Sequence, residues 1–120
     1  MSESRTFHGQ CQCGAVQYDV ETALDGMGMC NCSRCRRLGW VLQSAPASAF
    51  TLRQGENNLQ TYRFNTETIE HLFCRTCGVE SFARGSDGKG TAMVMINVLC
   101  LEPPVAVDQA AIQHWDGANW

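Results

Sequence analysis

The chain has 120 residues and a mass of 13.3 kDa, so we expect residues 1–120 to form one small domain. A formal charge of −3 and a pI near 5.5 argue against a nucleic-acid surface, which normally carries a basic excess. The sequence has no apolar run of about 18 residues and no apolar segment near its N-terminus, so we expect a cytoplasmic protein with no membrane span.

Strand patterns dominate the first half of the chain. In GAVQYDVE, residues 14–21, Val16, Tyr18 and Val20 alternate with polar residues, which is typical of a half-buried strand. We expect a second strand in WVLQSA, residues 40–45, closed by Pro46. A turn-rich GENN segment separates the next two predicted strands, and this predicts a hairpin formed by residues 50–55 and 59–64.

The second half of the chain continues the strand pattern. ETIEHLF, residues 67–73, is a predicted strand that leads directly to Cys74. Residues 90–99 are apolar on both faces, as expected of a central strand, and the preceding SDGKG segment predicts a hairpin tip. Helical signal is confined to a turn or two after Cys32 and to VDQAAI near the end. We therefore predict a mainly β fold in which loops carry the cysteines.

Eight cysteines in 120 residues are the outlying feature of the composition. In a reducing cytosol such a density indicates metal binding, whereas in a secreted protein it would indicate disulfides. Disulfide frameworks usually scatter their cysteines along the chain, but here all except Cys100 fall in tight local groups. These groups are Cys11 and Cys13, then Cys30, Cys32 and Cys35, then Cys74 and Cys77.

The first and last groups together predict a structural zinc site. Side chains two apart on an extended segment face the same way, so Cys11 and Cys13 can reach one ion. Cys74 and Cys77 have the spacing of a zinc knuckle, with Gly78 supplying the tight turn. Iron in the same four-thiolate geometry and a redox disulfide in either pair are the alternatives.

The middle group, Cys30, Cys32 and Cys35, predicts a second site of a different kind. A lone cysteine such as Cys100 is more often a small buried hydrophobe than a ligand. His8, His71 and His114 have no spacing that ties them to this group, so we expect surface or packing roles for all three. Three thiolates and one exchangeable ligand are the arrangement expected where zinc performs chemistry.

Three arginines, Arg34, Arg36 and Arg37, surround the middle group. Their charge can offset that of three thiolates and lower the thiol pKa values. A guanidinium also matches a carboxylate, so we predict that Arg34 and Arg36 bind the carboxylate of an acidic ligand. The alternative is a solvated basic turn. Trp40 is predicted either to wall a pocket or to belong to the core.

Four segments together resemble one known family. CQCGAV, CNCSRCRRLG, FCRTCG and the terminal HWDGANW occur in the order found in the glutathione-dependent formaldehyde-activating enzyme family, also called centromere-protein-V-like. The resemblance runs from about residue 6 to residue 120 and implies a zinc-binding β-tent fold. The chain departs from the commonest pattern at Gln12 and Asn31, where many members carry histidine, and after Cys77, so its pocket walls are expected to differ.

The resemblance also implies roles for the cysteines and a chemistry. Cys11, Cys13, Cys74 and Cys77 would hold a structural zinc, whereas Cys30, Cys32 and Cys35 would hold a catalytic one. The implied activity is that of a carbon–sulfur lyase acting on adducts of a small thiol such as glutathione with a small aldehyde such as formaldehyde.

Three other functions compete with this one. The first is a zinc-binding interaction module in which both ions are structural and Cys100 or a histidine closes the second site. The second is a carrier of metal or thiol, and the third is a redox switch that uses the middle cysteines.

Overall fold

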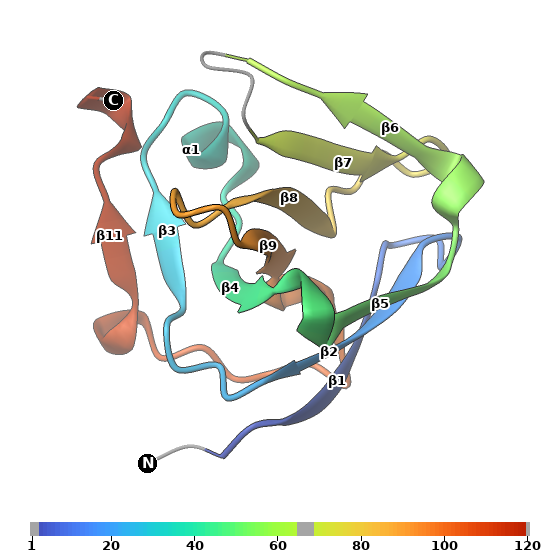
Figure 1. Cartoon of the computed structure of the whole chain (residues 1–120), viewed down its shortest axis with the longest axis horizontal. Coiled ribbons are helices and arrows are strands. Elements are labelled where there is room, and N and C mark those ends of the chain that lie inside the picture. Colours follow the sequence, from blue (N-terminus) through green and yellow to red (C-terminus); the bar gives the residue numbers. More distant parts are fainter. Residues whose placement is uncertain (1–2, 65–68, 120) are drawn as a thin grey trace.

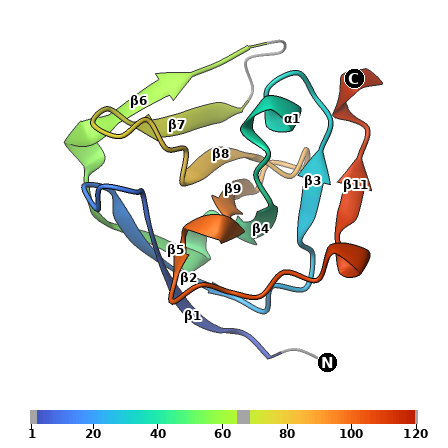
Figure 2. The ribbon, with the colours of Figure 1, turned by 180° about the vertical axis from the view of Figure 1, so that it is seen from behind.

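The computed structural model describes residues 3–64 and 69–119 and is built from two β-sheets (Figures 1 and 2). One sheet has four strands in the order β10-β1-β2-β5, and the other has seven in the order β11-β3-β4-β9-β8-β7-β6. Neighbouring strands are antiparallel except for β3 and β11. The strands are β1 (Arg5–Gln10), β2 (Gln17–Thr22), β3 (Gly28–Cys30), β4 (Leu42–Pro46), β5 (Phe50–Gln54), β6 (Leu59–Tyr62), β7 (Glu70–Cys74), β8 (Phe82–Ser86), β9 (Ala92–Asn97), β10 (Leu101–Glu102) and β11 (Gln113–Trp115).

Helical structure is short and lies between the strands. The α-helix α1 (Cys35–Leu38) follows β3 and ends at Gly39, whose φ of 66° is the left-handed conformation that glycine adopts without strain. The 3-10 turns are η1 (Ala47–Ala49), η2 (Glu56–Asn58), η3 (Val98–Cys100), η4 (Gln109–Ala111) and η5 (Gly117–Asn119). None of the helices in the described part of the chain has the length and apolarity that crossing a membrane requires.

The main core contains side chains from both sheets. Tyr18 and Val20 of β2 pack with Phe82 of β8 and Ile96 of β9, and all four side chains are almost fully buried. The rings of Tyr18 and Phe82 meet edge to face with centroids 5.7 Å apart, and the Tyr18 hydroxyl donates a hydrogen bond to the carbonyl of Ser81. Burial raises the pKa of Tyr18 well above its usual range.

The opposite face of the seven-stranded sheet carries a second cluster. Because side chains alternate along a strand, Ala83 and Met95 point away from the main core that their neighbours Phe82 and Ile96 enter. Ala83 and Met95 pack instead with the group that contains Cys30, Cys32, Cys35, Trp40 and Leu42. Because side chains alternate along its strands, the seven-stranded sheet has one face that packs in the main core and an opposite face that can form a binding site.

The mainly β fold predicted from the sequence is confirmed. The predicted strand at 14–21 corresponds to β2, and the predicted central strand at 90–99 corresponds to β9, which lies in the middle of the seven-stranded sheet. Ser86 pairs with Ala92, so the predicted hairpin tip joins β8 to β9. The predicted strand at 67–73 corresponds to β7, although residues 67 and 68 lie outside the described residues.

The predicted hairpin of residues 50–55 with residues 59–64 is wrong. Both segments form strands, but β5 pairs with β2 in one sheet and β6 pairs with β7 in the other. The chain changes sheet at Gly55, which has a φ of 97° and lies against the backbone of Ala15 and Val16, so closely that a side chain would clash with it. The GENN segment does form a turn between the two strands, as predicted. The contacts of Gly55 with Ala15 and Val16, however, direct the two strands to different partners.

Candidate metal centre and its pocket

Four cysteine sulfurs come together where the β1–β2 turn meets the end of β7. The Sγ atoms of Cys11, Cys13, Cys74 and Cys77 all lie within 4.8 Å of one another. The Sγ of Cys13 is 3.7 Å from that of Cys11 and 3.7 Å from that of Cys74. Zinc–sulfur bonds of about 2.3 Å in a tetrahedron place the sulfurs about 3.8 Å apart, so this spacing fits a single tetrahedral ion.

Backbone and side-chain donors surround the sulfur of Cys74. The N–H groups of Thr76 and Cys77 and the side-chain amide of Asn58 all donate to it. Burial opposes ionisation of this thiol, but hydrogen bonds from the N–H groups of Cys77 and Thr76 and from the thiols of Cys13 and Cys11 together outweigh it and lower the pKa of Cys74 to about 6. A thiol held as thiolate near neutral pH is a competent metal ligand.

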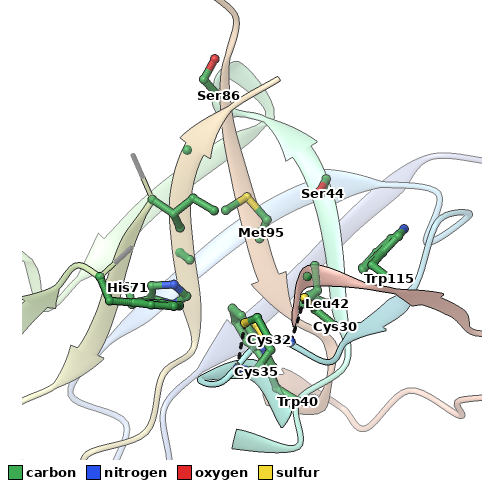
Figure 3. Close-up of a pocket in the computed structure, with 15 residues that line it drawn as sticks. Cys30, Cys32, Cys35, Trp40, Leu42, Ser44, His71, Ser86, Met95 and Trp115 are labelled. Atoms are coloured by element: carbon green, nitrogen blue, oxygen red, sulfur yellow. Dashed lines mark hydrogen bonds between the residues drawn. The ribbon is translucent and has the colours of Figure 1, made fainter. Parts of the chain in front are cut away.

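The other three cysteines of the predicted set meet at the end of β3 and the start of α1. The sulfurs of Cys30, Cys32 and Cys35 also lie within 4.8 Å of one another, and we call these three residues the trio. The N–H of Cys32 donates to the sulfur of Cys30, and the N–H of Cys35 donates to the sulfur of Cys32 (Figure 3). The loop backbone thus folds around the sulfurs and directs them to one point.

The C-terminal segment holds the trio loop in place. The side chain of Asn31, between Cys30 and Cys32, donates to Asp116 and accepts from the N–H of Ala118. The N–H of Asn31 also donates to the carbonyl of Trp115, beside the parallel pairing of β3 with β11. These contacts explain why the terminal HWDGANW segment belongs with the trio.

Both sulfur groups are suited to bind a zinc ion, because each is a compact set of thiols with N–H donors directed at the sulfurs. Burial raises the pKa of Cys35 to about 12, so this thiol stays protonated at neutral pH unless a cation lies beside it. The indole N–H of Trp40 is close enough to Cys35 to favour its thiolate, but it lies outside the limits of a regular hydrogen bond.

The trio opens into a cavity of about 390 Å³, which we call the trio pocket. Most of its wall is apolar, and Figure 3 shows the trio at one end, Met95 further along and Ser86 at the other end. None of the four cysteines of the first group is among the residues that line it. The lining residues are Cys30, Cys32, Cys35, Trp40, Leu42, Ser44, Phe64, Ile69, His71, Ala83, Gly85, Ser86, Met95, Trp115 and Gly117.

A buried polar network lies behind one residue of this wall, His71. The Nδ1 of His71 is 2.7 Å from Oε2 of Glu80, and the Nε and Nη2 of Arg34 donate to Oε1 of Glu80 at 3.1 and 2.7 Å. The side chain of Glu80 is only 1% exposed, so its charge depends on these partners. The His71 ring packs against those of Trp40 and Phe64, with ring centroids 6.3 and 5.4 Å away.

The arginines predicted to bind a carboxylate lie outside the trio pocket. The guanidinium of Arg34 is bound to Glu80 and stacks over the ring of Tyr62. With Arg37, it lines a second, shallower cavity of about 340 Å³. Arg36 is exposed on α1. Binding of a ligand carboxylate by Arg34 and Arg36 stays a prediction. In the structure, Arg34 already binds a carboxylate of the protein itself, that of Glu80.

Sequence reasoning missed the role of three residues. His71 was assigned to packing or the surface and is indeed buried, but it also lines the trio pocket. Trp115 lies in the terminal HWDGANW segment, but no sequence pattern gives it a role of its own, and it reaches the site through the parallel pairing of β3 with β11. Glu80 lies in no predicted strand or cysteine motif, and it reaches the site through its contacts with His71 and Arg34. Trp40 is both a buried residue and a wall of the pocket. Cys100 is buried and belongs to neither sulfur group.

Comparison with known proteins agrees with this geometry. Residues 6–115 match the model of the family described as glutathione-dependent formaldehyde-activating enzyme. The chain is also similar to a protein of Rhodobacter sphaeroides of known crystal structure, with 34% sequence identity and a TM-score of 0.77. That match covers 90% of this chain and 98% of the other.

Proposed function

The chain belongs to the glutathione-dependent formaldehyde-activating enzyme family, and from this premise we propose that it is a zinc-dependent carbon–sulfur lyase acting on thiol–aldehyde adducts. In an adduct R–S–CH(OH)–R′, the reaction breaks the carbon–sulfur bond, forms the aldehyde C=O and moves the hydroxyl proton to the sulfur. The reverse reaction joins the thiol to the aldehyde. Neither direction needs an oxidant or a reductant.

The proposal rests on one observation: the two sulfur groups differ in whether they line a cavity. The trio lines a cavity large enough for a small ligand, whereas the group of four cysteines lines none of the cavities described. A structural zinc site is closed by four protein ligands, and a catalytic one keeps a position for substrate. We therefore assign the structural zinc to Cys11, Cys13, Cys74 and Cys77, and the catalytic zinc to Cys30, Cys32 and Cys35.

The residues around the trio have distinct tasks in this proposal. When bound, zinc would supply a Lewis acid that polarises a carbonyl or stabilises a thiolate near neutral pH. Trp40 and Phe64 exclude water from the reacting atoms, and both pack against the His71 ring. Glu80 accepts from Nδ1–H of His71, which leaves the other ring nitrogen as the one that can take up and return a proton.

A second candidate is a non-catalytic zinc-binding interaction module with two structural ions. The exposed side chains of Leu38 and Tyr62 near α1 are the observation that favours it, since exposed apolar residues can meet a partner. That function needs a fourth protein ligand for the trio. Among the described residues, no histidine, aspartate, glutamate or further cysteine joins the trio within 4.8 Å.

Turnover of S-hydroxymethylglutathione and related adducts by the zinc-loaded protein tests the proposed function. Magnetisation-exchange NMR measures the rate at which free aldehyde and adduct interconvert, and this rate must rise in proportion to protein concentration. Cys32→Ser should abolish the increase while the group of four cysteines keeps its metal. An unchanged exchange rate with every adduct tried would reject the enzyme and favour the interaction module.

A further inference from the structure

We infer that the trio pocket takes an apolar group larger than a single carbon, so that the substrates are thiol adducts of branched or aromatic aldehydes. This inference rests on the proposed function and names the substrate class of the same site. It follows from the size of the pocket, the absence of charge on its described wall, and the residues between its two ends.

The pocket is too large for a one-carbon substrate alone. Its volume of about 390 Å³ lies in the range of cavities that hold small organic ligands, roughly 300–1,000 Å³. The hydroxymethyl group of a formaldehyde adduct has two heavy atoms and needs about two water volumes, roughly 60 Å³. Most of the cavity would therefore stay unfilled by that group, whereas a phenyl or branched alkyl group would occupy it.

The pocket also lacks partners for charged groups. Among the described residues, no aspartate, glutamate, lysine or arginine lines it. Glutathione carries two carboxylates and one ammonium group, and burying such charges without partners is strongly unfavourable. The nearby Arg34 is bound to Glu80. The charged ends of such a thiol therefore stay outside, and the group on the carbon side of the adduct enters the pocket.

The walls between the two ends suit an apolar, partly aromatic group. The trio lies at one end and Ser86 at the other, with Met95 between them (Figure 3). Trp40 and Trp115 contribute large flat surfaces, and a methionine adapts its shape to what packs on it. An aldehyde carbon at the trio would extend its substituent along Met95, where burial of each further CH₂ group strengthens binding.

A panel of adducts that share one thiol tests the substrate class. We would compare glutathione adducts of formaldehyde, 3-methylbutanal and phenylacetaldehyde with the zinc-loaded protein, and measure exchange rates by NMR. The expected result is a kcat/KM at least about tenfold higher for the two apolar aldehydes than for formaldehyde, the discrimination that an apolar pocket provides. A formaldehyde rate equal to or above the others would overturn the inference and leave the proposed function standing.

A charged residue in the pocket should remove this preference. Met95→Lys should lower the ratio of apolar to formaldehyde rates by about tenfold or more. Met93→Lys is the matched control, because Met93 is also half-buried on β9 but lines a different cavity, and it should keep the wild-type ratio. Equal ratios in both variants would contradict the inference. If Met95→Lys does not fold, Ser44→Phe, which narrows the pocket from an exposed position, gives the same test.

A binding measurement separates failure of this inference from failure of the proposed function. Phenylacetaldehyde should quench the fluorescence of the pocket tryptophans at lower concentration than formaldehyde does, and Ser44→Phe should weaken that quenching. If this quenching is seen but no adduct is turned over, the lyase proposal is rejected and the preference for apolar ligands is upheld. If both aldehydes quench equally, the preference for apolar ligands is overturned, whether or not any adduct is turned over.

Discussion

Nδ1 of His71 lies 2.7 Å from Oε2 of Glu80, at the junction between the trio pocket and the residues behind it. The second oxygen of Glu80 accepts two hydrogen bonds from Arg34, which belongs to the trio loop. One buried carboxylate thus ties the loop that carries the candidate metal site to β7 and fixes the orientation of a pocket histidine. Such an arrangement serves stability and site geometry together.

Glu80→Ala should lower the free energy of unfolding by about 3 kcal/mol or more, because it leaves the buried His71 and the partly buried Arg34 without their partner. Glu70→Ala is the control. Glu70 pairs with Arg63 at 3.3 Å with both side chains about half exposed, and such pairs contribute at most about 1 kcal/mol. Urea denaturation of the two zinc-loaded variants measures both values. Equal losses of unfolding free energy in the two variants would show that the Glu80 network contributes no more to stability than an exposed ion pair does.

The two sulfur groups should respond differently to loss of one ligand. Cys74→Ser opens the group of four, and a structural zinc contributes about 10–16 kcal/mol where a whole domain has about 5–15 to lose, so the fold should collapse. Cys32→Ser should leave the fold largely intact and abolish adduct turnover. Circular dichroism with metal analysis measures each outcome. Equal unfolding of both variants would contradict the division between a structural and a catalytic site.

Cys100 should resist alkylation far beyond the pH at which an ordinary thiol reacts. Burial raises its pKa from 9.0 to about 12, so the reactive thiolate is scarce in the folded protein until the pH approaches that value. The same shift means that the fold loses stability as the pH rises above 9.0, where the unfolded thiol ionises and the folded one does not.

Iodoacetamide labelling followed by mass spectrometry measures this resistance. Labelling of Cys100 in the native protein should stay slow at pH 9 and become fast in urea at the same pH. Rapid native labelling at pH 9 would show that the thiol is neither buried nor perturbed.

Gly28→Ala should displace Trp115, which is part of the wall of the trio pocket. A methyl group on Gly28 would overlap the ring of Trp115, which lines the trio pocket, so the indole must move. Overpacking of this kind costs about 1–3 kcal/mol. At Gly26 the nearest atom to an added methyl is 3.5 Å away on Gln43, an ordinary contact, so Gly26→Ala should cost no more than about 0.5 kcal/mol. Near-ultraviolet circular dichroism and thermal melting of both variants test this contrast.

Local sequence patterns predicted much of the fold. Alternation at Val16, Tyr18 and Val20 identified β2, because a strand with one buried face has a two-residue period. The same reasoning failed for the pairing of β5 and β6, since the partner of a strand depends on contacts with Ala15 and Val16 that lie far from Gly55 in sequence. Short strands such as β3 and β11 carry too few residues to show any period.

The candidate site was predictable where its chemistry is local. Cysteines two or three residues apart indicate shared ligation, and the structure brings all seven of them into groups of four and three. The wall of the pocket was not predictable, because His71 and Trp115 come from strands far apart in the sequence, and Glu80, which holds His71, comes from a third segment. No local pattern marks these three residues, so only the tertiary structure reveals that they lie near one another.

X-ray absorption spectroscopy at the zinc edge, combined with metal counting, tests the division into two zinc sites most directly when the purified protein is compared with Cys32→Ser, which should keep the fold and only the four-sulfur ion. We expect two zinc ions per chain, one bound by four sulfurs and the other by three sulfurs and one exchangeable light atom that an added thiol replaces. Two ions that are each closed by four protein ligands, or a trio that binds no metal at all, would contradict this division.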